Sequence, residues 1–497
     1  MAKLDSVTGI TAFGFYVPSL RLQRKTLLDE FGWINPGLAA YRQGARAVCD
    51  FDEDVVTMAV EAVLRSRSQD ALSNASALFM ASSNFPFVDR LNTSIVAAAC
   101  GMSNMLEAVD VANTQRAGLS ALRMAREFSS HNAAEQEVIC VASDKRRGRP
   151  GSTVEMTSGD AAAAFAFGSE KVLARILAHR ASTVDFVDHF RAAGAAYDYG
   201  WEERWIRDAG YLKIAPPVLL ATLEDAGVSP EEIDHFIFPS TIRGVTAQLA
   251  KAAGIAKDAI CDDFQDILGE AGVAHPLLML ADTLSSAGAG EKILLAGFGQ
   301  GCEAFVLETT PEISTMSKQD GVRAKVQGDE QMDLPTLRYL SFNGQLDVDF
   351  GARAEADRKT SLSAAYRHAP DLARLVAGIC TVCGTVQFPK AAICVNPNCR
   401  HEGEQDDHSL AQEAASIKTI TTDWLGFSLN PPNRYGMVEF ESGARMIVNF
   451  TGTAHEPAIS GTINMAYRIQ EFDPMRNYHR YCWKAKPDRV EAGGEVK

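Results

Sequence analysis

Four cysteines lie within twenty residues of the sequence, as Cys380-x2-Cys383 and Cys394-x4-Cys399. Two such knuckles can surround one metal ion with four thiolates, in the tetrahedral geometry that structural zinc prefers. Gly384 directly after the first pair suits the tight turn that a knuckle requires. Because four thiolates leave no coordination position open, we expect structural zinc here. The alternative is four unconnected thiols in a loop.

Glu270 and His275 lie on a glycine-rich approach to the apolar run LLMLADTL, where a charged pair has little structural purpose. A carboxylate beside an imidazole can act as a general base when burial and the neighbouring charge adjust their proton affinities. Both residues could also simply cap the helix that follows, so the two interpretations remain open.

The turn GFGQG at 297–301 contains Gly299, Gln300 and Gly301. Glycine lets backbone N–H groups come close to a substrate oxygen, as an oxyanion hole requires. Glycine-rich turns also join strands without any such role.

The composition is that of a folded protein, with 46% hydrophobic and 22% charged residues in 497. This length is about three times a domain of roughly 150 residues, so two or three units are expected. The net charge of −15 disfavours nucleic-acid binding, which depends on basic surface. The first residues lack a secretory signal, and no apolar run approaches the roughly 18 residues of a membrane span. We therefore expect a cytoplasmic protein with neither membrane nor nucleic-acid partners.

Up to residue 312, short β-branched runs alternate with amphipathic stretches, which is typical of layered α/β structure. Strands are expected at 6–15, 77–82, 137–142, 161–167, 235–238, 292–297 and 304–308, and helices at 54–65, 93–100, 118–128, 218–226 and 274–284.

The remaining sequence predicts a linker and a β-rich module. Residues 313–354 contain few periodic apolar positions and are expected to form the linker. A helix at 355–366 should precede the cysteines, and the acidic stretch 402–407 should be a solvated loop. Alternating runs from about 415 to 485 predict antiparallel strands in a small barrel.

Five stretches in order resemble hydroxymethylglutaryl-CoA synthases and related condensing enzymes of the thiolase superfamily. They are ITAFGFYVPSLRL, DEDVVTMAVEAVL, VASDKRRGRPGSTVEMTSGDAAAAFAFG, VDHFR…WEERW and ILLAGFGQGCEAFVLE. The C-terminal part resembles the zinc-ribbon plus OB-fold accessory proteins that accompany thiolase-like enzymes.

The resemblance implies an α/β, thiolase-like five-layered fold of two βαβαβαββ halves, at 1–170 and 171–312. A helix plus zinc ribbon at 355–404 and an OB-fold domain with a tail at 405–497 would follow the linker. It also implies an acyl-CoA thioester as substrate and a homodimer.

The family's nucleophilic cysteine stands at the N-terminus of a buried helix, where the helix dipole lowers its pKa. The family pattern places Gln115 at that position, in EAVDVANTQRAGLSALRMAREF, and Cys100 does not match it. An amide cannot form a thioester, so acyl transfer through an acyl-enzyme is not expected.

The other family positions match less directly. Ser83 stands where the family has its catalytic glutamate, and Glu270 matches the last polar position. The family histidine corresponds to Ile237, or to Ser240 in a shifted match, with His235 nearby. His189 and Tyr199 fall in a segment that lies toward the active site in the resembling enzymes, although both could instead pack a long connection.

A retro-aldol cleavage of a β-hydroxyacyl-CoA needs a base and enolate stabilisation but no nucleophile, so it is the leading hypothesis. Gln115 would then donate a hydrogen bond to the substrate. The alternatives are Claisen condensation or thiolysis, decarboxylation, and a non-catalytic acyl-CoA-binding scaffold.

Overall fold

The computed structural model describes residues 8–131, 136–316, 320–328, 331–352, 361–452 and 456–488. The first residues of the helix expected at 355–366 and the tail beyond 488 lie outside this part. Within the described residues, α13 (Leu362–Arg367) begins after Ser361.

One nine-stranded sheet path runs through the first 312 residues, in the order β11-β12-β13-β8-β1-β7-β6-β4-β5. The N-terminal half contributes five strands: β1 (Gly9–Tyr16), β4 (Ala77–Ala81), β5 (Glu107–Val111), β6 (Val138–Lys145) and β7 (Asp160–Gly168). The C-terminal half contributes β8 (Ala174–Thr183), β11 (His235–Ile237), β12 (Lys292–Phe298) and β13 (Gly301–Thr309). The halves meet where Ile10 of β1 pairs with Ala174 of β8.

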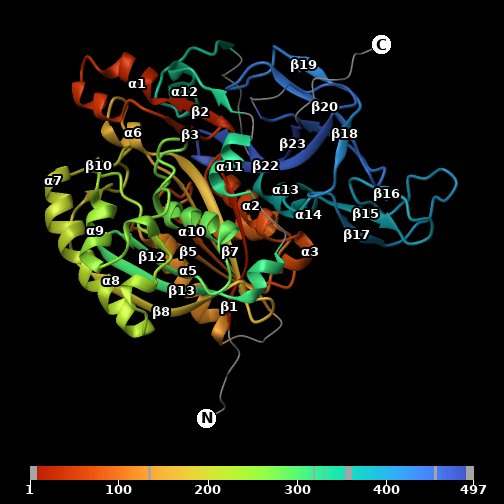
Figure 1. Cartoon of the computed structure of the whole chain (residues 1–497). Coiled ribbons are helices and arrows are strands. Elements are labelled where there is room, and N and C mark those ends of the chain that lie inside the picture. Colours follow the sequence, from red (N-terminus) through yellow and green to blue (C-terminus); the bar gives the residue numbers. More distant parts are fainter. Residues whose placement is uncertain are drawn as a thin grey trace.

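Helices cover both faces of these strands and produce five layers (Figure 1). α2 (Val55–Ser66) packs on the outer face of β1, β6 and β7, and α8 (Leu212–Ala226) packs on the outer face of β8 and β13. α5 (Ala117–Ser130) and α10 (His275–Ser286) lie between the two halves. The sequence DAAAAFAFG keeps β7 narrow and fully buried, so that helices can approach it on both faces. The expected five-layered α/β architecture is confirmed.

The shorter elements of the described chain complete the fold. They are α1 (Arg24–Phe31), α3 (Gln69–Leu72), α4 (Asn92–Ala99), α6 (Thr153–Thr157), β9 (His189–Phe190), β10 (Tyr199–Gly200), α7 (Glu203–Trp205), the π-helical turn η2 (Ile206–Tyr211), α9 (Val245–Ala253) and α14 (Ala369–Leu372).

Two expectations for the first 350 residues need correction. α8 begins six residues before the expected 218, because Pro216 and Pro217 lie inside the helix rather than before it. The segment 313–354 contains α11 (Val322–Gly328) and α12 (Thr336–Phe342), whereas a linker was expected. Its β14 (Met332–Asp333) also adds to a sheet with β2 (Leu20–Gln23) and β3 (Ala45–Val48), so tertiary pairing orders this segment despite its polar composition.

The cysteine region forms a three-stranded sheet in the order β16-β15-β17. Its strands are β15 (Val376–Cys380), β16 (Val386–Gln387) and β17 (Gln405–Ser409). β17 corrects the expected loop at 402–407, because its backbone pairs with β15 while its charged side chains point to solvent.

The last described residues form the small β module. Its strands are β18 (Ala415–Ile417), β19 (Thr421–Asp423), β20 (Asn433–Phe440), β21 (Arg445–Asn449), β22 (Thr462–Asp473) and β23 (Tyr478–Pro487). A bridge between Phe450 and Ala485 brings the end of β21 to β23, which closes the sheet on itself. This closure is compatible with the expected OB-like barrel.

The β module packs on the α2 layer of the core, and the two share one hydrophobic cluster. Charged residues join them as well. Lys484 lies 2.8 Å from Asp52, and Arg468 lies 2.9 Å from Glu53. Among the described residues, no helix has the length and apolar character needed to cross a membrane.

Candidate functional site

Gln115 lies two residues before the start of α5, next to the turn that joins β12 to β13. Gly299 of that turn is so close that a Cβ on it would lie 2.9 Å from the backbone nitrogen of Gln115. The Gly299 carbonyl accepts hydrogen bonds from Thr114 Oγ1 at 2.9 Å and Arg116 Nε at 3.0 Å. Glycine is therefore required at 299 for the Gln115 loop to take its position.

A histidine and a carboxylate complete the surroundings of Gln115. The side-chain nitrogen of Gln115 lies 3.1 Å from Nε2 of His189, and Nδ1 of His189 lies 3.1 Å from Oδ1 of Asp188. Gln300 donates from Nε2 to the same Asp188 oxygen at 3.0 Å. Gln300 takes φ of +47°, a conformation that costs energy for a residue other than glycine and that recurs at functional sites.

The hydrogen bonds determine the state of the imidazole. The Gln115 amide nitrogen can only donate, so Nε2 of His189 accepts and Nδ1 carries the proton toward Asp188. Burial alone would raise the pKa of Asp188, but its hydrogen bond to His189 and the charge of that histidine outweigh burial and hold the pKa below its usual value. The Asp188–His189 pair thus has the arrangement of an oriented general base.

Tyr211, which the sequence did not single out, lies beside this pair at the end of the π-helical turn η2. Its ring packs against Phe298, with centroids 4.5 Å apart, and its hydroxyl contacts Ser240. Burial, followed by the charges of Asp188 and Glu270, raises the pKa of Tyr211. A neutral phenol beside an oriented histidine can donate a proton or a hydrogen bond, and π-helical turns are frequent at functional sites. The π-helical irregularity has no sequence signature, so no sequence signal identified Tyr211.

Asp144 supplies a carboxylate next to Ser83, the residue matched to the family glutamate. The Ser83 hydroxyl lies 2.8 Å and 2.9 Å from the two Asp144 oxygens, and the Val273 backbone N–H donates to Asp144 at 3.1 Å. Burial raises the pKa of Asp144. β4 and β6 are parallel neighbours, so residues that follow their carboxyl ends meet at one edge. In the sequence, the polar residues that follow the strand expected at 137–142 indicate that Asp144 belongs to a site at this edge.

Glu270 lies on the other side of Arg146, whose Nη1 is 3.6 Å from a Glu270 oxygen. Arg146 also pairs with Asp198 at 2.8 Å, and Arg191 pairs with Asp198 at 2.6 Å. Burial would raise the pKa of Asp198, but Arg146 and Arg191 hold it below its usual value. Glu270 thus belongs to a buried charge network at the border of the site.

His275 does not pair with Glu270. Nδ1 of His275 accepts from the Ala271 backbone N–H at 3.0 Å, so Nε2 donates to the Asp263 carbonyl at 2.8 Å. With both ring nitrogens bonded to the backbone and the side chain fully buried, His275 fixes the start of α10 and has no nitrogen left for proton transfer.

His235 lies apart from the array around Gln115, whereas Tyr199 lies on β10, the strand that pairs with His189 and Phe190 of β9. His235 begins β11 and bonds Glu291 at 2.7 Å, whereas Ser240, which contacts Tyr211, follows the other end of that strand. Tyr199 is 54% exposed, and its partner in the sheet is Phe190.

Of the three turn residues expected to supply an oxyanion donor, Gly299 does not offer its backbone N–H to a substrate. The backbone N–H of Gly299 donates to the Gly301 carbonyl at 2.9 Å, so it is used within the turn. The backbone N–H of Gln115, in contrast, donates to no acceptor in the described part of the chain.

The four clustered cysteines form a site that could hold a metal. The sulfurs of Cys380, Cys383, Cys394 and Cys399 all lie within 4.8 Å of one another. Two of the sulfur pairs are 3.9 Å and 3.6 Å apart. Tetrahedral zinc with bonds of about 2.3 Å would separate its sulfurs by about 3.8 Å, so the donor set fits such an ion.

The six cysteines outside this cluster are poor nucleophiles. Burial raises the pKa of each, to about 12 for Cys140 and Cys302 and to about 11 for Cys261 and Cys482. Burial likewise raises the pKa of Cys49 and Cys100.

Comparison with known proteins agrees with the fold. Residues 223–308 match the family model described as 3-oxoacyl-[acyl-carrier-protein (ACP)] synthase III C terminal. The chain is 27% identical over 316 residues to the hydroxymethylglutaryl-CoA synthase of Methanocella arvoryzae, covering 62% of this chain and 89% of that protein. It is 27% identical over 318 residues to the enzyme of the same name from Caldivirga maquilingensis, covering 61% and 88%.

Solved structures show the same likeness. A structure of hydroxymethylglutaryl-CoA synthase complexed with CoA superposes with a TM-score of 0.58 at 16% identity, covering 70% of this chain and 92% of that one. The 3-oxoacyl-(acyl carrier protein) synthase III of Pseudomonas aeruginosa gives a TM-score of 0.54 at 18% identity, covering 61% and 98%. The chain is therefore similar to hydroxymethylglutaryl-CoA synthases over about 62% of its length, and its core has a thiolase-like fold.

Proposed function

We propose that this protein is a lyase that cleaves a β-hydroxyacyl-CoA by a retro-aldol reaction without an acyl-enzyme. The observation that supports this most is the array Asp188–His189–Gln115. It places an oriented base, with its lone pair inward, against an amide at the position where related enzymes carry a cysteine.

In the proposed reaction, the β-hydroxyl group of the substrate replaces the Gln115 amide as the hydrogen-bond partner of His189 Nε2, which then takes the hydroxyl proton. The oxygen electrons form the carbonyl of the leaving ketone or aldehyde, and the electrons of the broken Cα–Cβ bond move onto Cα as a thioester enolate. Protonation of Cα by the imidazolium, or by Tyr211, gives the shorter acyl-CoA. Asp188 stabilises the imidazolium that forms between these steps.

The enolate oxygen needs hydrogen-bond donors that do not have to reorganise. The backbone N–H of Gln115 and the second proton of its side-chain amide supply them at the positive end of the α5 dipole. Gln115 thus takes a stabilising role in place of a nucleophilic one.

Claisen condensation or thiolysis is the second candidate, because the sequence relatives are named hydroxymethylglutaryl-CoA synthases. It requires either a covalent acyl-enzyme or direct attack by free CoA. The raised pKa values of the buried thiols argue against a cysteine acting as nucleophile from another position.

Three further features belong to this proposal. The ligand is a CoA thioester, and the C-terminal cysteines hold structural zinc beside an OB-fold barrel.

The protein forms a homodimer through β5, an edge strand whose side chains are partly exposed and which is followed by no strand in the described sheet. Two exposed apolar side chains near this edge, Val88 and Met105, would be covered there.

The experiment is mass spectrometry of products after the purified protein is incubated with a panel of β-hydroxyacyl-CoA and β-ketoacyl-CoA thioesters, each with and without free CoA. We expect hydroxyacyl-CoA cleavage without added CoA, and an intact-protein mass that shows no acyl adduct. Turnover of ketoacyl substrates only with CoA would establish the condensation alternative instead.

Two histidine variants provide a matched comparison. His189 and His235 each bond a carboxylate, Asp188 and Glu291, but only His189 contacts Gln115. His189→Gln should therefore abolish cleavage, whereas His235→Gln should leave it close to the wild-type rate. Equal losses in the two variants would contradict the assignment of the base.

A further inference from the structure

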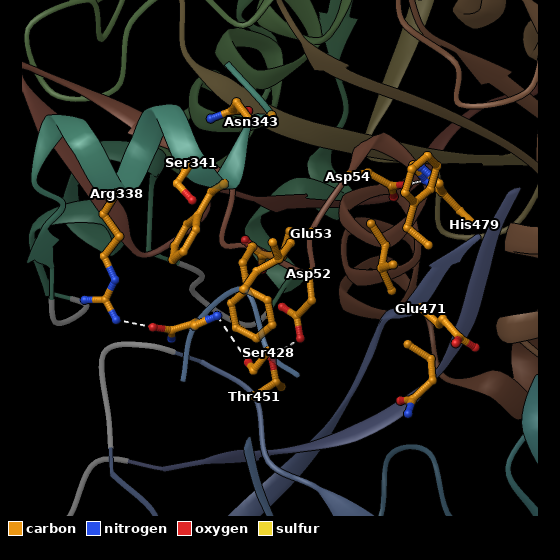
Figure 2. Close-up of a pocket in the computed structure, with 18 of the residues that line it drawn as sticks. Asp52, Glu53, Asp54, Arg338, Ser341, Asn343, Ser428, Thr451, Glu471 and His479 are labelled. Atoms are coloured by element: carbon orange, nitrogen blue, oxygen red, sulfur yellow. Dashed lines mark hydrogen bonds and ion pairs between the residues drawn. The ribbon is translucent and has the colours of Figure 1, made fainter. Parts of the chain in front are cut away.

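A cavity of about 1560 Å³ lies between the thiolase-like core, α12 and the β module. Its volume exceeds the roughly 300–1,000 Å³ of ordinary small-molecule sites. Figure 2 shows the core acid Asp52 near Thr451 of the β module and the core acid Asp54 beside His479, with Arg338 extending from α12. Three separate parts of the chain therefore form its walls, and Gln115 is not among the lining residues.

The acidic groups of this lining are already paired. Asp52 bonds Lys484 at 2.8 Å, and Glu53 bonds Arg468 at 2.9 Å. The other three acids also have partners, which are Tyr481 for Asp54, Arg434 for Glu456 and Arg480 for Glu471. The carboxylates therefore offer little free negative charge to a ligand.

Three cations of the lining have no carboxylate oxygen within ion-pair distance in the described chain: Lys145, Arg147 and Arg338. Arg338 donates only to the neutral side chain of Asn430 and lies over the ring of Phe342, 5.7 Å from its centroid. These cations come from the end of β6, the loop after it and α12. In a chain of net charge −15, this local positive excess selects for an anion.

The electrostatics of two of these cations agree with an anionic ligand. Burial lowers the pKa of Lys145, but nearby Cys49 and Asp160 outweigh it and raise that pKa, so the ammonium stays charged. Burial and the like charge of Arg191 lower the pKa of Arg147. An anion bound beside Arg147 would offset that repulsion.

Aromatic side chains line the same cavity and offer faces on which a planar ring can stack. They include Tyr197, Phe342 and Trp424, and Trp424 is 62% exposed. Arginines that recognise phosphate, combined with aromatic faces, are the elements of nucleotide recognition.

We propose that the cavity binds a phosphorylated nucleotide, with its phosphates on Lys145, Arg147 and Arg338 and its base among the aromatic side chains. Two sources share this chemistry, the phosphoadenosine end of a CoA thioester and a free nucleotide. Arg146 connects the cavity to the array around Gln115, because it lines the cavity and also contacts Asp198 and Glu270. The CoA source rests on the proposed function, whereas nucleotide binding itself does not.

The test is isothermal titration of the full chain with CoA, adenosine 3′,5′-bisphosphate, ADP and inorganic pyrophosphate. The variants are Arg147→Gln, Arg338→Gln and Arg338→Lys. Arg175→Gln is the matched control, because Arg175 is exposed on β8 and does not line the cavity. Loss of one charged phosphate contact should weaken binding by about 10- to 100-fold.

The outcomes separate the two sources. Weaker binding of CoA and adenosine 3′,5′-bisphosphate in Arg147→Gln and Arg338→Gln, with Arg338→Lys less affected and Arg175→Gln unchanged, would identify CoA. The same pattern for ADP alone would identify a free nucleotide. Unchanged affinities in both glutamine variants, or no nucleotide binding at all, would overturn the proposal. Pyrophosphate bound as tightly as the nucleotides would overturn its nucleotide part.

The titration measures binding without turnover, so the nucleotide site and the lyase activity can be refuted separately. An inactive protein whose nucleotide binding depends on Arg147 would refute only the lyase. An active lyase whose affinities do not change in these variants would refute only the nucleotide site.

Discussion

Replacing Asp188 by asparagine tests the general base with almost no change of shape. The carboxylate lies 3.1 Å from Nδ1 of His189. With an effective dielectric constant of about 20, its attraction to the imidazolium is at most about 5 kcal/mol. Part of this is recovered by relaxation, so we expect kcat to fall by about 10²- to 10³-fold, equivalent to about 2.7–4 kcal/mol.

The assay is steady-state cleavage of the best β-hydroxyacyl-CoA, followed by release of the shorter acyl-CoA across a range of pH. KM should change little, because Asp188 acts through His189 in this mechanism. The pKa of Asp188 is held low, so its carboxylate stays ionised as pH falls below 5. An acid limb above that pH in the wild-type profile would therefore report another group.

Asp188→Asn could also lower activity by loosening the segment around it. Gln300→Ala removes one of the other hydrogen bonds to the Asp188 carboxylate without removing its charge, so it should cost about tenfold or less. A loss in Asp188→Asn no larger than that in Gln300→Ala, or a rise in KM with unchanged kcat, would refute the assignment of His189 as the base.

Other parts of the molecule give predictions with simpler readouts. Cys399→Ser should lose the zinc that atomic absorption finds in the wild type, whereas Cys261→Ser should keep it, because only Cys399 belongs to the cluster. Lys484→Met should lower the free energy of unfolding by about 3–5 kcal/mol in denaturant titration, because it leaves Asp52 buried without its ion-pair partner. Adding Asp52→Asn to that variant should recover most of the loss. Met105→Glu should shift the protein from dimer to monomer in light scattering, and a wild-type monomer would contradict the proposed role of β5.

The sequence was informative about elements whose burial is periodic along the chain. The strand expected at 161–167 is β7, and the helix expected at 118–128 is α5, because each has a continuous buried face. β8 was not predicted, since only alternate residues at its start are buried and its end is polar. The segment 313–354 was predicted to be a linker because its regular structure depends on the pairing of β14 with β2, which no local sequence pattern indicates.

The candidate site could be predicted only in part, for a similar reason. The resemblance led to Gln115 and His189, and the structure brings these two together. Asp188 was overlooked although it directly precedes His189, because its role depends on which way two adjacent side chains turn. Glu270 and His275 are five residues apart, but the fold directs the first to Arg146 and the second to backbone groups.

The end of β6 explains how the proposed active site and the proposed nucleotide cavity can share one scaffold. Side chains alternate between the two faces of a strand, so Asp144 and Lys145, the last two residues of β6, point to opposite faces, and Arg146 follows the strand. Asp144 bonds Ser83, and Arg146 reaches Glu270, on the side of Gln115. Lys145 faces the α2 layer, on which the β module packs. Three consecutive residues therefore connect both sites. A ligand that draws Arg146 toward the cavity would weaken the contact between Arg146 and Glu270. Binding in the cavity should therefore change the active site through the end of β6.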